Sequence, residues 1–207
     1  MNQDILSTIK KVMEEEIEAI KKVYENLDET HVKAVELIQN CTGKVVFTGV
    51  GKSGHIGKKL AATFASTGTP TFFVHSTEAL HGDLGMIEER DVVIAISNSG
   101  ETKEVLSILP SIKYIGAKLI SITGNSESTL AKESDVALEA KVSHEADPLN
   151  LAPTSSSTVA LVLGDALAIT LSQLKGFKRE NFAVCHPGGS LGKQLFEEMK
   201  NLEKGEN

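Results

Sequence analysis

Five short apolar runs, rich in β-branched residues and mostly separated by longer amphipathic segments, constrain the fold of this chain more than any other feature. The runs are 45–48, 71–74, 92–96, 119–123 and 136–138. They lack strict alternation, which is typical of strands buried on both faces of a parallel sheet. Helical patterns between them cover 53–66, 102–115 and 127–132. This order predicts an α/β fold, a doubly wound five-stranded parallel sheet of flavodoxin-like strand order with helices on both faces.

Further helical patterns flank this core. Residues 3–27 carry apolar side chains at helical spacing, and a second helix is expected over 30–40. A long helix begins near Pro153 and ends before Gly176, a residue type favoured just after a helix. We expect a single domain over 1–207, with N-terminal helices in 1–41, the sheet-containing core in 42–197 and a fraying tail in 198–207.

Composition argues against several classes of function. The formal net charge of -7 disfavours nucleic-acid binding, because such proteins carry a basic face. No apolar run approaches the roughly 18 residues that cross a bilayer, and the acidic start is unlike a signal peptide. Two cysteines, Cys41 and Cys185, are too few for a disulfide framework. We therefore expect a cytoplasmic protein that binds neither nucleic acid nor membrane.

The loops after the first and third strands are the most unusual parts of the sequence. A doubly wound sheet binds ligands beyond the carboxyl ends of its strands, where the strand order reverses. With the common order 2-1-3-4-5, the loops at that point are 49–54 (GVGKSG) and 97–102 (SNSGET). Each opens a helix and so offers free N–H groups and the positive end of a helix dipole. Together they predict a phosphate cradle.

Hydroxyl groups strengthen that prediction. N-capping accounts for one hydroxyl at a helix start, but these two loops bring four, from Ser53, Ser97, Ser99 and Thr102, to a single switch point. A phosphate monoester accepts many hydrogen bonds and can use all of them. The residues expected to bind the phosphate group are Gly51, Ser53, Ser97, Asn98, Ser99 and Thr102.

Nucleotide and metal sites are the competing interpretations of these motifs. The loop 49–54 also matches the dinucleotide pattern G-x-G-x-x-G, but that pattern requires an acidic residue at the end of the second strand, where His75 and Ser76 stand. A P-loop would need glycine at position 46, which is valine. The cluster of His144, Glu145 and Asp147 lacks the spacing of a metal-binding helix. We therefore expect neither a cofactor nor a metal.

Five motifs in order resemble those of sugar isomerase (SIS) domains. Loop 97–102 resembles their S-x-S-G-E-[ST] phosphate loop, and 49–54 resembles their first-strand loop. The remaining motifs are 79–86 (ALHGDLGM), 144–156 (HEADPLNLAPTSS) and 186–189 (HPGG). Together they are similar to the arabinose 5-phosphate isomerases of this family, over about 35–197. Many such proteins carry paired CBS regulatory domains after the catalytic one. This sequence ends at Asn207, so we expect a short form without them.

The resemblance implies an aldose–ketose isomerase that interconverts D-ribulose 5-phosphate and D-arabinose 5-phosphate through an enediol. Such a reaction needs an acid/base pair, a group that stabilises the enediolate and a group that opens the sugar ring. The alternatives are a non-catalytic sugar-phosphate-binding SIS module and a hexulose-phosphate isomerase. The resemblance carries the catalytic roles to Lys52, His81, Glu104, Glu145 and His186.

The residues themselves support these roles unequally. Lys52 lies between glycines at a strand end, where a cation offsets phosphate or enediolate charge. Glu101 and Glu104 share one helix face, and the residues alone do not choose between them. For Glu145 we expect burial beside Leu149 and Leu151 to tune the carboxylate.

The remaining roles follow from the same resemblance. Glu145 and His186 are expected to share the acid/base work in an order that the sequence leaves open, and His81 or Glu104 to assist ring opening. Relatives of this kind pair into dimers and tetramers with shared sites. We therefore expect a homotetramer that binds a small sugar phosphate, with His186 contributed across subunits and the apolar stripe of 3–27 at a subunit contact.

Overall fold

The five strands form one parallel sheet in the order β2-β1-β3-β4-β5. In this computed structural model, which describes residues 2–189, 192–195 and 197–198, the strands are β1 (Val45–Gly49), β2 (Thr71–His75), β3 (Val92–Ile96), β4 (Lys118–Thr123) and β5 (Val136–Glu139). Their bounds match the predicted runs to within one residue at each end. The predicted α/β class and strand order are therefore confirmed.

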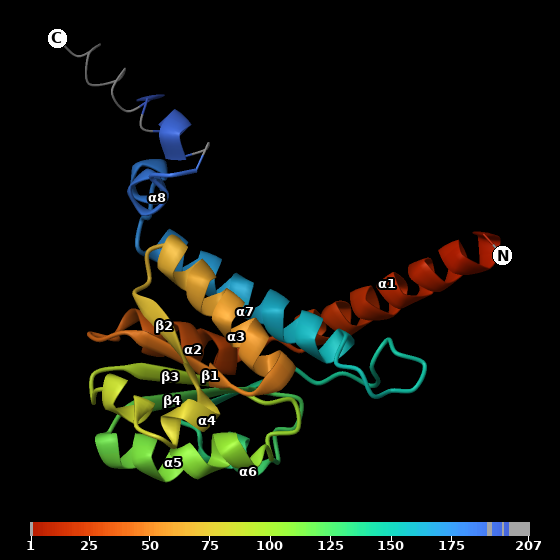
Figure 1. The fold of residues 1–207 in the computed structure, drawn as a ribbon, viewed down its shortest axis with the longest axis horizontal. Helices are drawn as coiled ribbons and strands as arrows, with labels where there is room; N and C mark the ends of the chain where they lie inside the picture. Colours follow the sequence, from red (N-terminus) through yellow and green to blue (C-terminus); the bar gives the residue numbers. More distant parts are fainter. Residues whose placement is uncertain (1, 190–191, 196, 199–207) are drawn as a thin grey trace.

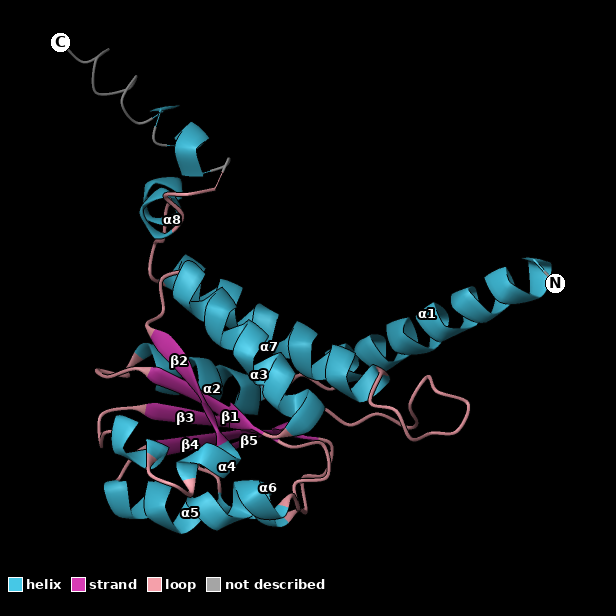
Figure 2. Cartoon of the chain, viewed as in Figure 1, coloured by secondary structure: helices cyan, strands magenta, loops and turns pink. Residues whose placement is uncertain are grey.

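Helices cover both faces of the sheet (Figures 1 and 2). The helices are α1 (Asn2–Glu25), α2 (Glu29–Gln39), α3 (Gly51–Ser66), α4 (Ser76–Ala79), α5 (Lys103–Ile115), α6 (Thr129–Glu133), α7 (Ser155–Leu174) and α8 (Arg179–Cys185), with a 3-10 turn η1 at Asp83–Met86. One buried cluster joins the sheet to α2, α3 and α7, and another joins it to α5 and α6. The strands read as continuous apolar runs because both of their faces are covered.

Helix α1 extends away from the body toward the N-terminus (Figure 1). Its apolar side chains Ile5, Ile9, Met13 and Ile17 are each more than half exposed. The stripe that the sequence predicts is therefore present, and the described part of this chain leaves it largely uncovered. Helix α7 carries further exposed apolar groups on its outer side, among them Ile169.

Helix α7 corrects one expectation from the sequence. No apolar run near 18 residues was expected, yet Ser155–Leu174 has a mean hydropathy of 1.5 and is long and apolar enough to cross a membrane by length and composition. Serine, threonine and Asp165 interrupt the run, but the apolar residues around them keep its mean hydropathy high. The inner face of α7 packs on α3, where Gly164 lies against Leu60. A core helix of a globular domain has the same profile.

The short helices α4 and α8 and the turn η1 were not predicted, because four to seven residues carry too little periodicity to be recognised. Gly176 has a φ of 61° just after α7, as its proposed role at the end of that helix requires. The predicted fraying of 198–207 falls almost wholly outside the described residues.

Candidate active site

A cleft lies at the switch point of the sheet, beyond the carboxyl ends of the central strands. Strand β1 pairs with both β2 and β3, and Gly49 is in register with Ile96. The residues lining the cleft come from α3, the turns after β3 and β4, the end of β5 and the start of α7. They are Lys52, Ser53, Ile56, Ile96, Asn98, Ile122, Thr123, Gly124, Ala140, Pro153, Ser156, Ser157 and Ala160. A ligand is expected at this place in a doubly wound fold.

The first loop brings the start of α3 to the cleft. Val50 precedes the helix in an extended conformation and makes no side-chain cap, and Gly51 has a φ of 58°, which favours glycine. Gly54 sits close to the strand, because a Cβ there would lie 3.1 Å from the carbonyl oxygen of Gly49. This geometry places Lys52 and Ser53 in the first turn of α3, and both line the cleft.

The second loop is organised by its own hydroxyl groups. Ser97 is 2% exposed, and its Oγ lies 2.8 Å from Oγ1 of Thr102 and accepts from the N–H of Gly100 at 3.1 Å. The Oγ of Ser99 accepts from the N–H of Glu101 at 3.2 Å. Asn98 lines the cleft beside Lys52 and Ser53. The two turns therefore adjoin, while the hydroxyls of Ser97, Ser99 and Thr102 are bonded within the second turn.

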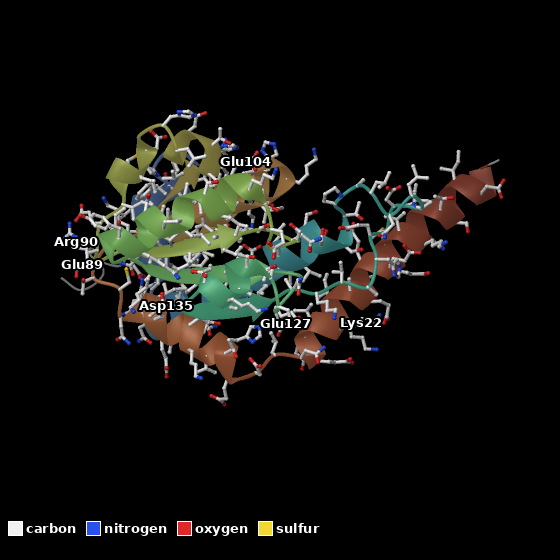
Figure 3. All side chains as sticks on the ribbon, turned by 90° about the horizontal axis from the view of Figure 1, so that it is seen from below. Lys22, Glu89, Arg90, Glu104, Glu127 and Asp135 are labelled. Atoms are coloured by element: carbon white, nitrogen blue, oxygen red, sulfur yellow. The ribbon has the colours of Figure 1, made fainter. Side chains whose placement is uncertain are left out.

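The structure separates the two glutamates that the sequence left equivalent. Oε1 of Glu101 accepts from the N–H of Thr129 at the start of α6 at 2.7 Å. That bond holds the pKa of Glu101 below its ordinary value. Glu104 stands half-buried in the first turn of α5 (Figure 3). Glu101 thus joins the turn before α5 to the start of α6, and Glu104 is not among the residues that line the cleft.

Glu145 is bound to the first turn of α7. Its Oε2 accepts from the N–H of Thr154 at 2.8 Å, from the hydroxyl of Thr154 at 3.2 Å and from the N–H of Ser156 at 3.1 Å. Its Oε1 accepts from the hydroxyl of Ser156. Burial raises the pKa of Glu145, but the hydrogen bonds from Ser156 and Thr154 lower it by more, so the pKa lies below its ordinary value.

This geometry corrects the expected surroundings of Glu145. Leu149 and Leu151 are 73% and 77% exposed and provide no apolar enclosure. The loop turns outward around Asp147, whose carboxylate accepts from the N–H groups of Leu149, Leu151 and Ala152. Backbone and hydroxyl donors, rather than neighbouring leucines, therefore set the environment of Glu145.

The two expected histidines lie at different ends of the molecule. His81 is exposed in the turn after α4, beyond the carboxyl end of β2. His186 ends α8, where its ring stacks on Phe182 at 3.8 Å and its Nδ1 lies 2.9 Å from the carbonyl oxygen of Phe182. Helix α7 begins at the cleft and spans 20 residues, about 30 Å, before the chain reaches α8. Figure 1 shows α8 beyond the far end of α7. His186 therefore lies far from the cleft of its own chain.

The motifs in the sequence assign no role to Thr154, Ser156 or Thr123. Thr154 and Ser156 hold Glu145, and Ser156 and Thr123 line the cleft. The sequence does carry a signal for Thr154 and Ser156, since hydroxyl residues after a proline and before an apolar run mark a helix start.

Among the residues that the structure describes, no group of three or more His, Cys, Asp or Glu side chains is arranged to hold a metal ion.

Comparisons with known proteins agree with this architecture. The chain is 53% identical to arabinose 5-phosphate isomerase KdsD of Pseudomonas aeruginosa over 97% of its own length and 62% of the relative's. It is 52% identical to KdsD of Escherichia coli K12, covering 93% of this chain and 59% of that protein. The chain thus spans about three-fifths of the length of these curated relatives.

A solved structure and a family model extend the comparison. The structure of E. coli CFT073 c3406 in complex with arabinose 5-phosphate superposes with a TM-score of 0.89 at 54% identity, covering 90% of this chain and 100% of that one. The SIS domain model matches residues 37–170, which include the sheet, both turns and most of α7. This chain belongs to the SIS domain family.

Proposed function

We propose that this chain is an aldose–ketose isomerase that interconverts D-ribulose 5-phosphate and D-arabinose 5-phosphate through an enediol intermediate. One observation carries the proposal: Lys52, Ser53 and the Glu145-bound start of α7 adjoin at a single cleft at the switch point. The likeness to proteins named arabinose 5-phosphate isomerase, and to a structure that holds arabinose 5-phosphate, supports the same substrate class here.

The two turns suit the phosphate end of the substrate. Helix starts supply N–H donors and a positive dipole end, which favour an anion. In our proposal the phosphate contacts Gly51, Ser53, Ser97, Asn98, Ser99 and Thr102. Ser97 and Thr102 exchange their mutual hydrogen bond for bonds to phosphate oxygens. Lys52, exposed in the first turn of α3, offsets the charge of the phosphate or the enediolate.

The chemical step moves one proton between adjacent carbons and another between their oxygens. The pKa of Glu145 lies below its ordinary value, so its carboxylate is ionised at neutral pH and able to accept a proton. We assign the acid/base work to Glu145 and His186, with their order left open, and ring opening or proton transfer between oxygens to His81 or Glu104. These roles need neither a cofactor nor a metal.

The position of His186 supports the proposal of a site shared between subunits. A histidine beyond the far end of α7 meets a cleft only if another copy of the chain supplies it. We infer a homotetramer in which each cleft is completed by His186 of the partner subunit. The exposed apolar stripe of α1 and the outer side of α7 support contacts between copies.

We further infer one SIS domain over 1–207, with N-terminal helices in 1–41, the core in 42–197 and a tail in 198–207, acting in the cytoplasm.

An assay with purified protein tests the reaction. Ribulose 5-phosphate is added and arabinose 5-phosphate is followed by NMR, and a hexulose 6-phosphate is supplied in a parallel reaction. We expect the pentose phosphates to interconvert. Preferential conversion of the hexulose phosphate, or binding of ribulose 5-phosphate without turnover, overturns the proposal in favour of a hexulose-phosphate isomerase or a sensor.

Mixing inactive subunits tests the shared site. Lys52→Met and His186→Asn each remove one part of the cleft, and we expect each variant alone to lose most activity when the substrate concentration is at or below the parental KM. If copies share their sites, co-refolded mixtures contain some clefts with both native residues and recover activity. Mixtures that stay inactive while forming mixed oligomers contradict the assignment of His186 to the partner subunit.

A further inference from the structure

The carboxylate of Glu145 has a different set of partners on each oxygen. Oε2 is held by the N–H of Thr154 at 2.8 Å, by the hydroxyl of Thr154 at 3.2 Å and by the N–H of Ser156 at 3.1 Å. Oε1 accepts the hydroxyl of Ser156. Three of the four donors therefore converge on the oxygen turned to the helix start, and one side-chain hydroxyl engages the other oxygen.

Ser156 is also a residue of the cleft wall. It is 5% exposed, and it lines the cleft together with Lys52, Ser53 and Asn98. Thr154, in contrast, is tied into the loop, because its Oγ1 also accepts from the N–H of Ala146 at 2.8 Å. Thr154 thus fixes the loop that carries Glu145, whereas Ser156 links Glu145 directly to the surface that faces a ligand.

We propose that Ser156 is a positioning residue of the isomerase, whose hydroxyl fixes Oε1 of Glu145 in the orientation that serves the substrate in the cleft. This inference rests on the proposed function. It assigns a role to a side chain that does not itself exchange a proton with the sugar. Thr154 keeps Oε2 bound when Ser156 is altered, so the loop retains its anchor.

Loss of the Ser156 hydroxyl should raise the pKa of Glu145. Burial raises the pKa of Glu145, and the hydrogen bond from the Ser156 side chain is the foremost of those that lower it. When that hydroxyl is removed, the effect of burial on the pKa is opposed by fewer hydrogen bonds, and the pKa of Glu145 moves up. A base must be deprotonated to act, so the acid limb of the kcat/KM profile then moves to higher pH.

The experiment compares Ser156→Ala with two further variants. Ser156→Thr keeps a hydroxyl at the same position. Ser157→Ala is the matched control, because the Oγ of Ser157 donates to the carbonyl oxygens of Pro153 and Thr154 instead of to Glu145. Circular dichroism and melting curves establish that each variant is folded. Kinetics are measured over pH, and the titration of Glu145 is followed by ¹³C NMR of labelled glutamate, assigned with Glu145→Gln.

For Ser156→Ala we expect kcat to fall about tenfold or more with little change in KM, since hydrogen bonds to charged groups carry that much free energy. We also expect the acid limb and the Glu145 titration to move together to higher pH. Ser156→Thr retains the parental titration, and Ser157→Ala keeps the acid limb in its parental place. An active parent whose Ser156→Ala variant keeps the parental kcat and Glu145 titration overturns the positioning role. A parent without turnover overturns the proposed function, and the positioning role with it.

Discussion

The carboxylate of Glu16 on α1 accepts a hydrogen bond of 2.9 Å from the hydroxyl of Thr158 on α7. The bond joins residues 142 positions apart and fastens the projecting helix to the first turns of the helix that lines the cleft. The Nζ of Lys22, also on α1 (Figure 3), donates a hydrogen bond of 2.9 Å to the hydroxyl oxygen of Ser143, which lies two residues before Glu145. Helix α1 is thus tied to both segments that hold Glu145.

Replacing Thr158 by valine should loosen α1. The change removes a donor to a partly buried carboxylate and should lower the free energy of unfolding by about 1 kcal/mol. Amide exchange in α1 should become faster, which hydrogen-exchange mass spectrometry measures. Thr8→Val is the control, because the hydroxyl of Thr8 bonds to the carbonyl oxygen of Asp4 within the same helix. Equal exchange of α1 in parent and Thr158→Val would show that this bond does not anchor the helix.

Replacing Gly164 by alanine should destabilise the protein, although alanine favours helix. A Cβ at 164 would lie 2.4 and 2.5 Å from the two Cδ atoms of Leu60, which is fully buried. Overpacking of this kind costs about 1–3 kcal/mol, and most of that range exceeds the roughly 1 kcal/mol gained in helix propensity. Denaturant unfolding measures the difference. Gly85→Ala, where the new Cβ meets no atom within 4 Å, serves as control. A Gly164→Ala protein as stable as the parent would contradict close packing of α3 on α7.

The loop that carries Glu145 should depend on pH through Asp147. The N–H groups of Ala152, Leu151 and Leu149 hold the pKa of Asp147 below its ordinary value. Because the folded-state pKa is depressed, the ionised carboxylate stabilises the loop fully above the unfolded-state pKa, and this contribution is lost as pH falls through the folded-state pKa. Protection of the amides of 149–152 from exchange should therefore decrease on acidification. In Asp147→Asn that protection should be low and nearly independent of pH, and a variant with parental protection would refute the role of Asp147.

Lys52→Met should weaken substrate binding. A cation in the first turn of α3 attracts a phosphate, so its loss should raise KM by about tenfold or more and reduce the salt dependence of kcat/KM. Lys58→Met is the matched control on the same helix, since the Nζ of Lys58 lies over the Phe73 ring at 5.4 Å. Similar KM values for the two variants would place the phosphate elsewhere.

The sheet was predictable from the sequence because burial on both faces imposes a local signature, the unbroken β-branched run. The positions of the two turns were predictable because glycine and serine between an apolar run and a helical pattern mark turns and helix starts. The environment of Glu145 was not, because its donors Thr154 and Ser156 lie 9 and 11 residues away across a loop whose closure depends on Asp147 and Asn150. The distance of His186 from the cleft was equally hidden, since it reflects the length and direction of α7.

Solvent exchange during turnover tests the central claim most directly. Ribulose 5-phosphate is incubated in D₂O with the parent and with Glu145→Gln, and the C2 position of the arabinose 5-phosphate that forms is followed by ¹H NMR. We predict that the product carries deuterium at C2, and that Glu145→Gln slows both its formation and its labelling through kcat. A Glu145→Gln protein that forms arabinose 5-phosphate at the parental rate would contradict proton transfer by Glu145 at this cleft.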